Sequence, residues 1–174
     1  PESLNSLDPK SGQVYWSMEL QPGYQMSIAA PRLEGDYLYA SGIGNVGALY
    51  ELDQGKPAAS VVWRGTPKNA VYASNTTPII DSGVIYGVDC SSGALTAARI
   101  EDGRRLWETM QPTTGGQRRA SHGTAFIVKH KNGYFLFSET GDLILANLSP
   151  QGYREISRFH VLDPTNECFG RPVV

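Results

Sequence analysis

The sequence predicts an all-β protein, a partial β-propeller of four-stranded antiparallel blades. Pro31, Pro78 and Pro172 are spaced by 47 residues and by twice 47, and Ala125 stands at the skipped position. Glycines (19) and prolines (11) are numerous among the 174 residues, which favours many turns and short strands over long helices. Because propeller blades commonly take about 40 to 50 residues, the chain corresponds to about 3.7 repeats of roughly 47 residues.

Each repeat is expected to open with a short strand, a tight turn and a second strand. The first strand is a Pro or Ala followed by apolar residues, as in Pro78-Ile79-Ile80. Glycine-containing turns such as Asp81-Ser82-Gly83 then supply the positive φ of a hairpin. The second strand carries pairs of large residues two apart, which share one face of the strand: Tyr37/Tyr39, Val84/Tyr86 and Phe135/Phe137.

The second half of each repeat is a third strand, a turn and an outer strand. A leucine follows two residues after a glycine in every third strand, at Gly47, Gly93 and Gly141. The outer strand closes on a large residue, which is Ile156 in the last repeat and a tryptophan elsewhere: Trp16, Trp63 and Trp107. A single sheet cannot bury both faces by itself, so these tryptophans are predicted to be structural and to dock one blade against the next.

The repeat places the whole chain, residues 1–174, in one propeller domain. The expected parts are a blade end at 7–16, blades at about 28–63, 75–107 and 122–158, and the start of a further blade at 169–174. Since closed propellers typically have four to eight blades, the sequence predicts a fragment of a longer protein. Its open blade edges could self-associate, because unpaired strand edges bind other strands.

Composition restricts the partners and the location. The net charge of −2 gives no reason to expect nucleic acid. No apolar run is long enough for a membrane span, and the first residues do not read as a signal peptide, which is absent or removed before this chain begins. Cys90 and Cys168 are interpreted as separate apolar side chains rather than a disulfide.

Candidate binding residues lie just before the third full blade. Asn75 and His122 stand three residues before a repeat position and could face the central channel, or they could be solvated polar residues at a strand start. Arg118 and Arg119 lie in the loop beside His122 and could bind an anion, or they could belong to a solvated loop. Carboxylates near strand ends, such as Asp89, are expected to cap turns.

Neither metal chemistry nor nucleotide binding is predicted. His122, His130 and His160 are not spaced as metal ligands. The stretch Gly42–Gly47 has the form G-x-G-x-x-G, but a strand of the repeat follows it. A dinucleotide site needs a helix there, so a hairpin loop is expected instead. No catalytic residues are assigned.

Three segments carry a resemblance to the quinoprotein (PQQ-like) β-propellers. The segment 7–16, Leu-Asp-Pro-Lys-Ser-Gly-Gln-Val-Tyr-Trp, resembles the tryptophan-docking motif of that family. The segments 77–87 and 47–53 are similar to its other two repeat motifs. The resemblance implies a bacterial, periplasmic or otherwise extracytoplasmic propeller. Its members include the outer-membrane assembly lipoproteins of the BamB type, which are scaffolds without a cofactor.

The favoured function is a non-catalytic extracytoplasmic scaffold for protein partners or a ligand. The alternatives are a fragment of a PQQ-dependent dehydrogenase and a sensor propeller fused to a signalling module. The resemblance implies that a quinoprotein dehydrogenase would carry a vicinal Cys-Cys pair, a catalytic Asp and Ca²⁺ ligands. No Cys-Cys pair occurs in this chain, so no cofactor is expected, although PQQ binding stays open.

Overall fold

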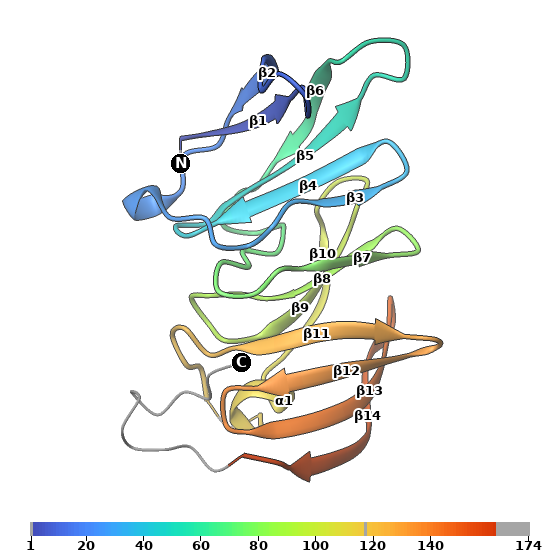
Figure 1. Cartoon of the computed structure of the whole chain (residues 1–174). Helices are drawn as coiled ribbons and strands as arrows, with labels where there is room; N and C mark the ends of the chain where they lie inside the picture. The colour runs from blue at the N-terminus through green and yellow to red at the C-terminus, as the bar shows by residue number, and fades with distance from the viewer. Residues whose placement is uncertain (1, 117, 163–174) are drawn as a thin grey trace.

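The structure, a computed structural model, describes residues 2–116 and 118–162 and is all-β, as predicted. One two-stranded and three four-stranded antiparallel sheets follow one another along the chain (Figure 1). The strands are β1 (Ser3–Leu7), β2 (Val14–Glu19), β3 (Arg32–Glu34), β4 (Tyr37–Gly42), β5 (Val46–Leu52), β6 (Ala59–Arg64), β7 (Ile79–Asp81), β8 (Val84–Val88), β9 (Leu95–Arg99), β10 (Arg105–Thr109), β11 (Ala125–His130), β12 (Gly133–Ser138), β13 (Asp142–Ser149) and β14 (Gly152–His160).

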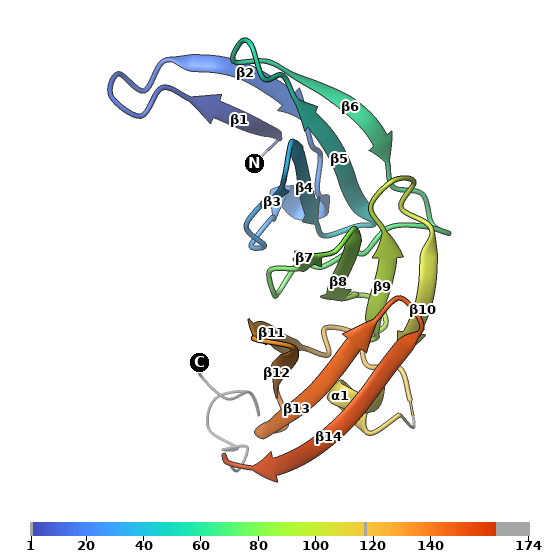
Figure 2. The same ribbon diagram turned by 90° about the vertical axis from the view of Figure 1, so that its right-hand side faces the viewer.

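The sheets stack face to face into an open arc, which is the partial propeller expected from the repeat. Strands pair in chain order within every sheet. Figure 2 shows the first strands β3, β7 and β11 on the concave side and the last strands β6, β10 and β14 on the convex side. Pro31 and Pro78 therefore directly precede the inner strands β3 and β7, and Ala125 is the first residue of the inner strand β11.

Local sequence explains the hairpins. The turn between β7 and β8 is formed by Ser82 and Gly83, which both have positive φ (53° and 76°), as a two-residue type I′ turn requires. The G-x-G-x-x-G stretch is the turn between β4 and β5, where Gly42 pairs with Val46. It is a hairpin loop, as expected.

Each hydrophobic core lies between two neighbouring sheets. Alternating side chains send one set of residues to each face of a strand, so β8 contributes Ile85 to one core and Tyr86 to the next. The first of these cores joins sheet β3–β6 to sheet β7–β10, and the second joins sheet β7–β10 to sheet β11–β14. A third, containing Tyr50, joins β1 and β2 to sheet β3–β6.

Two of the three tryptophans reach across such a boundary. The indole N–H of Trp63 donates to the Ile100 carbonyl at 2.7 Å, and that of Trp107 donates to the Ser149 carbonyl at 2.7 Å. Trp16 makes no indole hydrogen bond within the described part of the chain. Whether all three dock the blades energetically stays a prediction.

A β-bulge sets the position of these tryptophans. Trp107 pairs with Ala97 immediately after the bulge in β10. In the last sheet the residue that pairs immediately after the bulge is Ser157, opposite Leu145. Ile156, which was expected to replace the tryptophan, is the bulged residue itself. It therefore lies one residue before the position that Trp107 occupies in its sheet.

One short helix, α1 (Gln111–Thr114), precedes the third full sheet. Among the described residues no helix is long and apolar enough to cross a membrane. The expected further blade start at 169–174 and Cys168 lie outside the described residues.

Candidate interaction site between two blades

Three segments meet at one end of sheet β7–β10, and we call residues 66–75, 89–93 and 118–124 the loop cluster. The turn at 89–93 is its centre. A main-chain hydrogen bond from the Cys90 N–H to the Tyr72 carbonyl, at 3.1 Å, joins this turn to the segment before β7. Two more, from the N–H groups of Ala120 and His122 to the carbonyls of Ser92 and Cys90, fasten the segment before β11 at 3.0 and 2.8 Å. Segments from different repeats thus form one continuous surface.

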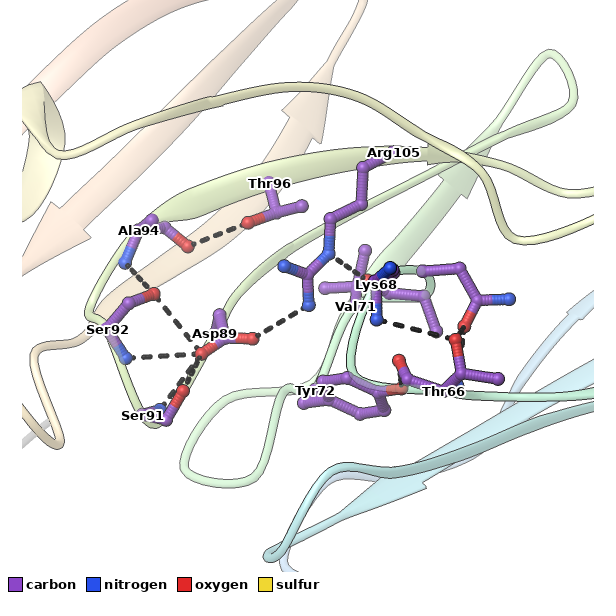
Figure 3. Close-up of polar contacts among 12 residues, drawn as sticks. Thr66, Lys68, Val71, Tyr72, Asp89, Ser91, Ser92, Ala94, Thr96 and Arg105 are labelled. Carbon is purple, nitrogen blue, oxygen red and sulfur yellow. Dashed lines mark hydrogen bonds and ion pairs between the residues drawn. The ribbon is translucent and has the colours of Figure 1, made fainter.

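Asp89 holds the central turn in place (Figure 3). Its Oδ1 accepts the main-chain N–H groups of Ser91 and Ser92 at 3.0 and 3.2 Å and both of their hydroxyl groups. Asp and Asn side chains stabilise such turns by accepting hydrogen bonds from main-chain N–H groups that follow them in the sequence. The expected role of Asp89 as the residue that caps this turn is therefore confirmed. The Asp89 side chain is only 5% exposed.

Arg105 of β10 connects this turn to the segment before β7. It lies 3.4 Å from Asp89 Oδ2, donates from Nε to the Ala70 carbonyl at 2.9 Å and stacks over the Tyr72 ring at 5.6 Å. The Tyr72 hydroxyl donates in turn to the Thr66 carbonyl. Burial raises the pKa of Tyr72, with Arg105 acting in the opposite direction. A charge pair with further hydrogen bonds to both partners is a rigid element.

A polar pocket of about 190 Å³ opens beside this network. Sheet β3–β6, sheet β7–β10 and the segment before β11 all contribute to its wall. Two guanidinium groups, two carboxylates and two hydroxyl groups line it, so positive and negative charges are balanced. The lining residues are Asn45, Pro67, Asp89, Ser91, Ser92, Arg105, Glu108 and Arg119.

All four sequence-predicted binding residues fall in the loop cluster. Arg119 is exposed and lines the pocket, and Arg118 is exposed with its carbonyl accepting a hydrogen bond from the Thr114 hydroxyl at 2.7 Å. Asn75 donates from Nδ2 to the His122 carbonyl at 3.5 Å. That these residues bind a partner stays a prediction.

His122 also lies next to a thiol. Its Nδ1 is 3.2 Å from Cys90 Sγ, and its backbone has a positive φ of 65°. That conformation is uncommon for a residue with a side chain. Within residues 2–116 and 118–162 no group of three or more His, Cys, Asp or Glu side chains could hold a metal ion.

Sequence reasoning missed Arg105 and the Cys90–His122 contact. The Asp-x-Ser-Ser-Gly run at 89–93 contains a detectable turn signal. The partner of Asp89 gives no comparable signal, because Arg105 lies on a different strand and is fixed only by the register of β9 and β10.

Comparisons with known proteins agree with the fold. The sequence profile described as outer membrane protein assembly factor BamB matches residues 2–166. The crystal structure of BamB from Moraxella catarrhalis is similar with a TM-score of 0.66 and 16% sequence identity, and the match covers 91% of this chain and 43% of that one. This chain thus spans less than half of the BamB chain.

Other solved structures are similar at a lower level. A europium-containing methanol dehydrogenase has a TM-score of 0.46 at 16% identity, covering 74% of this chain and 23% of that one. The computationally designed protein Ika8 has a TM-score of 0.47 at 10% identity, covering 93% and 57%. A search of curated proteins found no match. On the profile match, which covers nearly all of its length, the chain belongs to the BamB family of PQQ-like β-propeller repeat proteins.

Proposed function

We propose that this chain is part of a non-catalytic, extracytoplasmic scaffold that binds protein partners in outer membrane protein assembly. The family match over residues 2–166 supports this role. Fold alone does not determine function, so the proposal also needs a surface suited to recognition. The observation that carries it is the loop cluster, where three segments from neighbouring repeats join in one rigid polar surface.

The chemistry of the loop cluster suits recognition of a protein surface. Arginine is enriched at protein–protein interfaces, and the exposed Arg119 lines the same pocket as Ser91 and Ser92. The Asp89–Arg105 pair fixes the turn that carries these two serines. A surface that is ordered before binding loses less entropy when the partner arrives.

The test compares Arg119→Glu with Arg154→Glu in cells that depend on the natural gene product. Arg154 is an exposed arginine of β14 that pairs with Asn147. It lies far from the end of the sheet that adjoins the loop cluster, where Ala125 pairs with Ser138. The readout is the amount of folded outer membrane β-barrel protein. We expect Arg119→Glu to lower it and Arg154→Glu to leave it unchanged. Equal behaviour of both variants at equal protein level would contradict a role for the loop cluster.

A photo-crosslinking amino acid in place of Arg119 identifies the bound partner. We expect one protein of the envelope to be captured from position 119 and not from position 154, with the chain itself found in the periplasmic or membrane fraction. Recovery of the chain in the cytoplasmic fraction would contradict the proposed location.

A further inference from the structure

A thiol and an imidazole face each other where the turn at 89–93 meets the segment before β11. Cys90 Sγ lies 3.2 Å from Nδ1 of His122. Cys90 is a free cysteine and is partly exposed, and His122 is exposed, so the pair lies at the surface. A nucleophile within hydrogen-bond reach of a base is the arrangement by which proteins activate a cysteine.

The main chain holds the two side chains in this position. The His122 N–H donates to the Cys90 carbonyl at 2.8 Å, so the two residues are joined through their main chains as well as through their side chains. The His122 carbonyl accepts from the Thr124 hydroxyl at 3.0 Å and from Asn75 Nδ2 at 3.5 Å. A base that is oriented before the reaction does not have to be ordered during it.

The fold does not require a thiol and an imidazole at these places. Ile43 is the counterpart of Cys90 in the preceding sheet, because the N–H of each donates to the segment before the first strand of its own sheet. The counterpart of His122 is Asn75, which also stands three residues before a repeat position. The preceding boundary therefore forms with an isoleucine and an asparagine. The pair is a departure from the repeat that needs its own explanation.

The exposed charges beside the pair favour the approach of an anionic reagent. Arg118 and Arg119 are both exposed in the segment that carries the imidazole. The carboxylate next to the thiol, that of Asp89, is only 5% exposed and is paired with Arg105. Among the described residues that line the pocket beside Arg119, Glu108 is the one exposed carboxylate. Positive potential raises the local concentration of anions, so a small disulfide that carries carboxylates suits this surface.

We propose that Cys90 is a site of reversible modification, at which its thiol exchanges with a small anionic disulfide. The thiol proton passes to His122 Nδ1, and the thiolate attacks one sulfur of the reagent. A new S–S bond forms on Cys90 as the S–S bond of the reagent breaks, and the leaving thiolate takes up the proton from the imidazolium. Cys90 is oxidised to a mixed disulfide and half of the reagent is reduced to a thiol, so the disulfide is the oxidant.

The test measures how fast glutathione disulfide modifies Cys90 in the natural gene product that contains this chain, in a Cys168→Ser background. Mass spectrometry of peptides follows the mixed disulfide at pH 6, where an ordinary thiol is only about 0.3% thiolate. A Cys90→Ser, Val62→Cys variant supplies a reference thiol on β6, at a position 41% exposed. We expect Cys90 to react at least about fivefold faster than position 62, because the thiolate is the reacting form.

His122→Asn removes the imidazole and keeps a side chain that tolerates the positive φ of 65° at this position. His130→Asn is the matched control, since His130 lies at the opposite end of β11, where it pairs with Gly133. We expect His122→Asn to lower the rate at Cys90 to that of position 62, and His130→Asn to leave the rate unchanged.

Equal rates at positions 90 and 62 would overturn the inference. So would a rate at Cys90 that does not change in His122→Asn, or the finding that Cys90 and Cys168 form an intramolecular disulfide in the unaltered protein. The first comparison needs no change at His122, so it stands even where His122→Asn does not fold. None of these outcomes depends on whether the loop cluster binds a partner.

Discussion

Trp63→Phe tests whether the indole hydrogen bond holds two blades together. Phenylalanine keeps an aromatic ring near Tyr39, whose centroid lies 5.8 Å from that of Trp63, but it removes the donor to the Ile100 carbonyl at 2.7 Å. An intramolecular hydrogen bond contributes about 0.5–1.5 kcal/mol net, and a buried group left unsatisfied costs about 1–3 kcal/mol. We therefore expect the free energy of unfolding to fall by about 1–3 kcal/mol.

Trp16→Phe provides the matched control. It is the same chemical change at the corresponding place in the first sheet, and Trp16 makes no indole hydrogen bond within the described residues. We expect its cost to stay below about 1.5 kcal/mol, as for other apolar replacements of similar shape. Trp107→Phe should behave like Trp63→Phe, because its donor distance to Ser149 is also 2.7 Å.

Urea unfolding followed by circular dichroism measures all three variants. The slope of the free energy against urea must be unchanged for the comparison to report stability. An equal loss for Trp16→Phe and Trp63→Phe would refute the reasoning, since ring size and not the hydrogen bond would then set the cost.

Three further predictions concern charge and cofactor. Asp89→Ala should destabilise the protein by about 1–3 kcal/mol in thermal unfolding, because it removes the acceptor of the hydrogen bonds from Ser91 and Ser92 and the carboxylate partner of Arg105. The added change Arg105→Met should recover part of the loss, because no guanidinium is then left without its partner. Burial raises the pKa of Asp81, but hydrogen bonds from Lys129 and Tyr134 outweigh it and hold that pKa below its usual value. The stabilisation that the Asp81 carboxylate contributes is then fully present above the unfolded pKa of about 4 and is lost as the pH falls through the lower folded pKa. In Asp81→Asn the free energy of unfolding should therefore fall less steeply between neutral and acid pH. Titration with PQQ and Ca²⁺ should give no saturable absorbance change, and one-to-one binding would contradict the scaffold proposal.

The fold was predictable because its signals are local and repeated. Ser82-Gly83 specifies a hairpin by its backbone conformation, whatever lies around it. The alternation of Ile85 and Tyr86 between two cores follows from the two-residue period of a strand. Repetition every 47 residues then indicates stacked sheets, because one such sheet leaves a face uncovered.

The bulge in β14 was not predictable from spacing. Counting four residues from the turn glycine leads to Trp107, just after the bulge, in β10, but to Ile156, the bulged residue itself, in β14. The bulge of β14 lies one residue farther from its glycine, so Ser157 and not Ile156 lies opposite Leu145. A bulge adds one residue to one strand and turns the later residues of that strand to the other face. The count along the chain stays the same while the side chain that faces the neighbouring sheet changes.

The Asp89–Arg105 pair escaped prediction for a different reason. The positions that correspond to Arg105 just before the bulge are Val61 in β6 and Glu155 in β14. A comparison between repeats finds the residues that they share, and this arginine belongs to one repeat alone. The candidate site thus depends on residues that differ between the repeats, whereas the fold depends on residues that the repeats share.

The 47-residue spacing also appears in the contacts between sheets, and this has an energetic consequence. Ala30 N–H donates to the Thr77 hydroxyl, Asn75 Nδ2 to the His122 carbonyl and Arg158 Nη2 to the Gln111 carbonyl, each across 47 residues. Each sheet therefore contacts its immediate neighbours, and stability is close to a sum of sheet and boundary contributions. Weakening the Trp107 boundary should expose the amides of β11–β14 to hydrogen exchange before those of the other sheets. Uniform acceleration of exchange in all sheets would show instead that the arc unfolds as one unit.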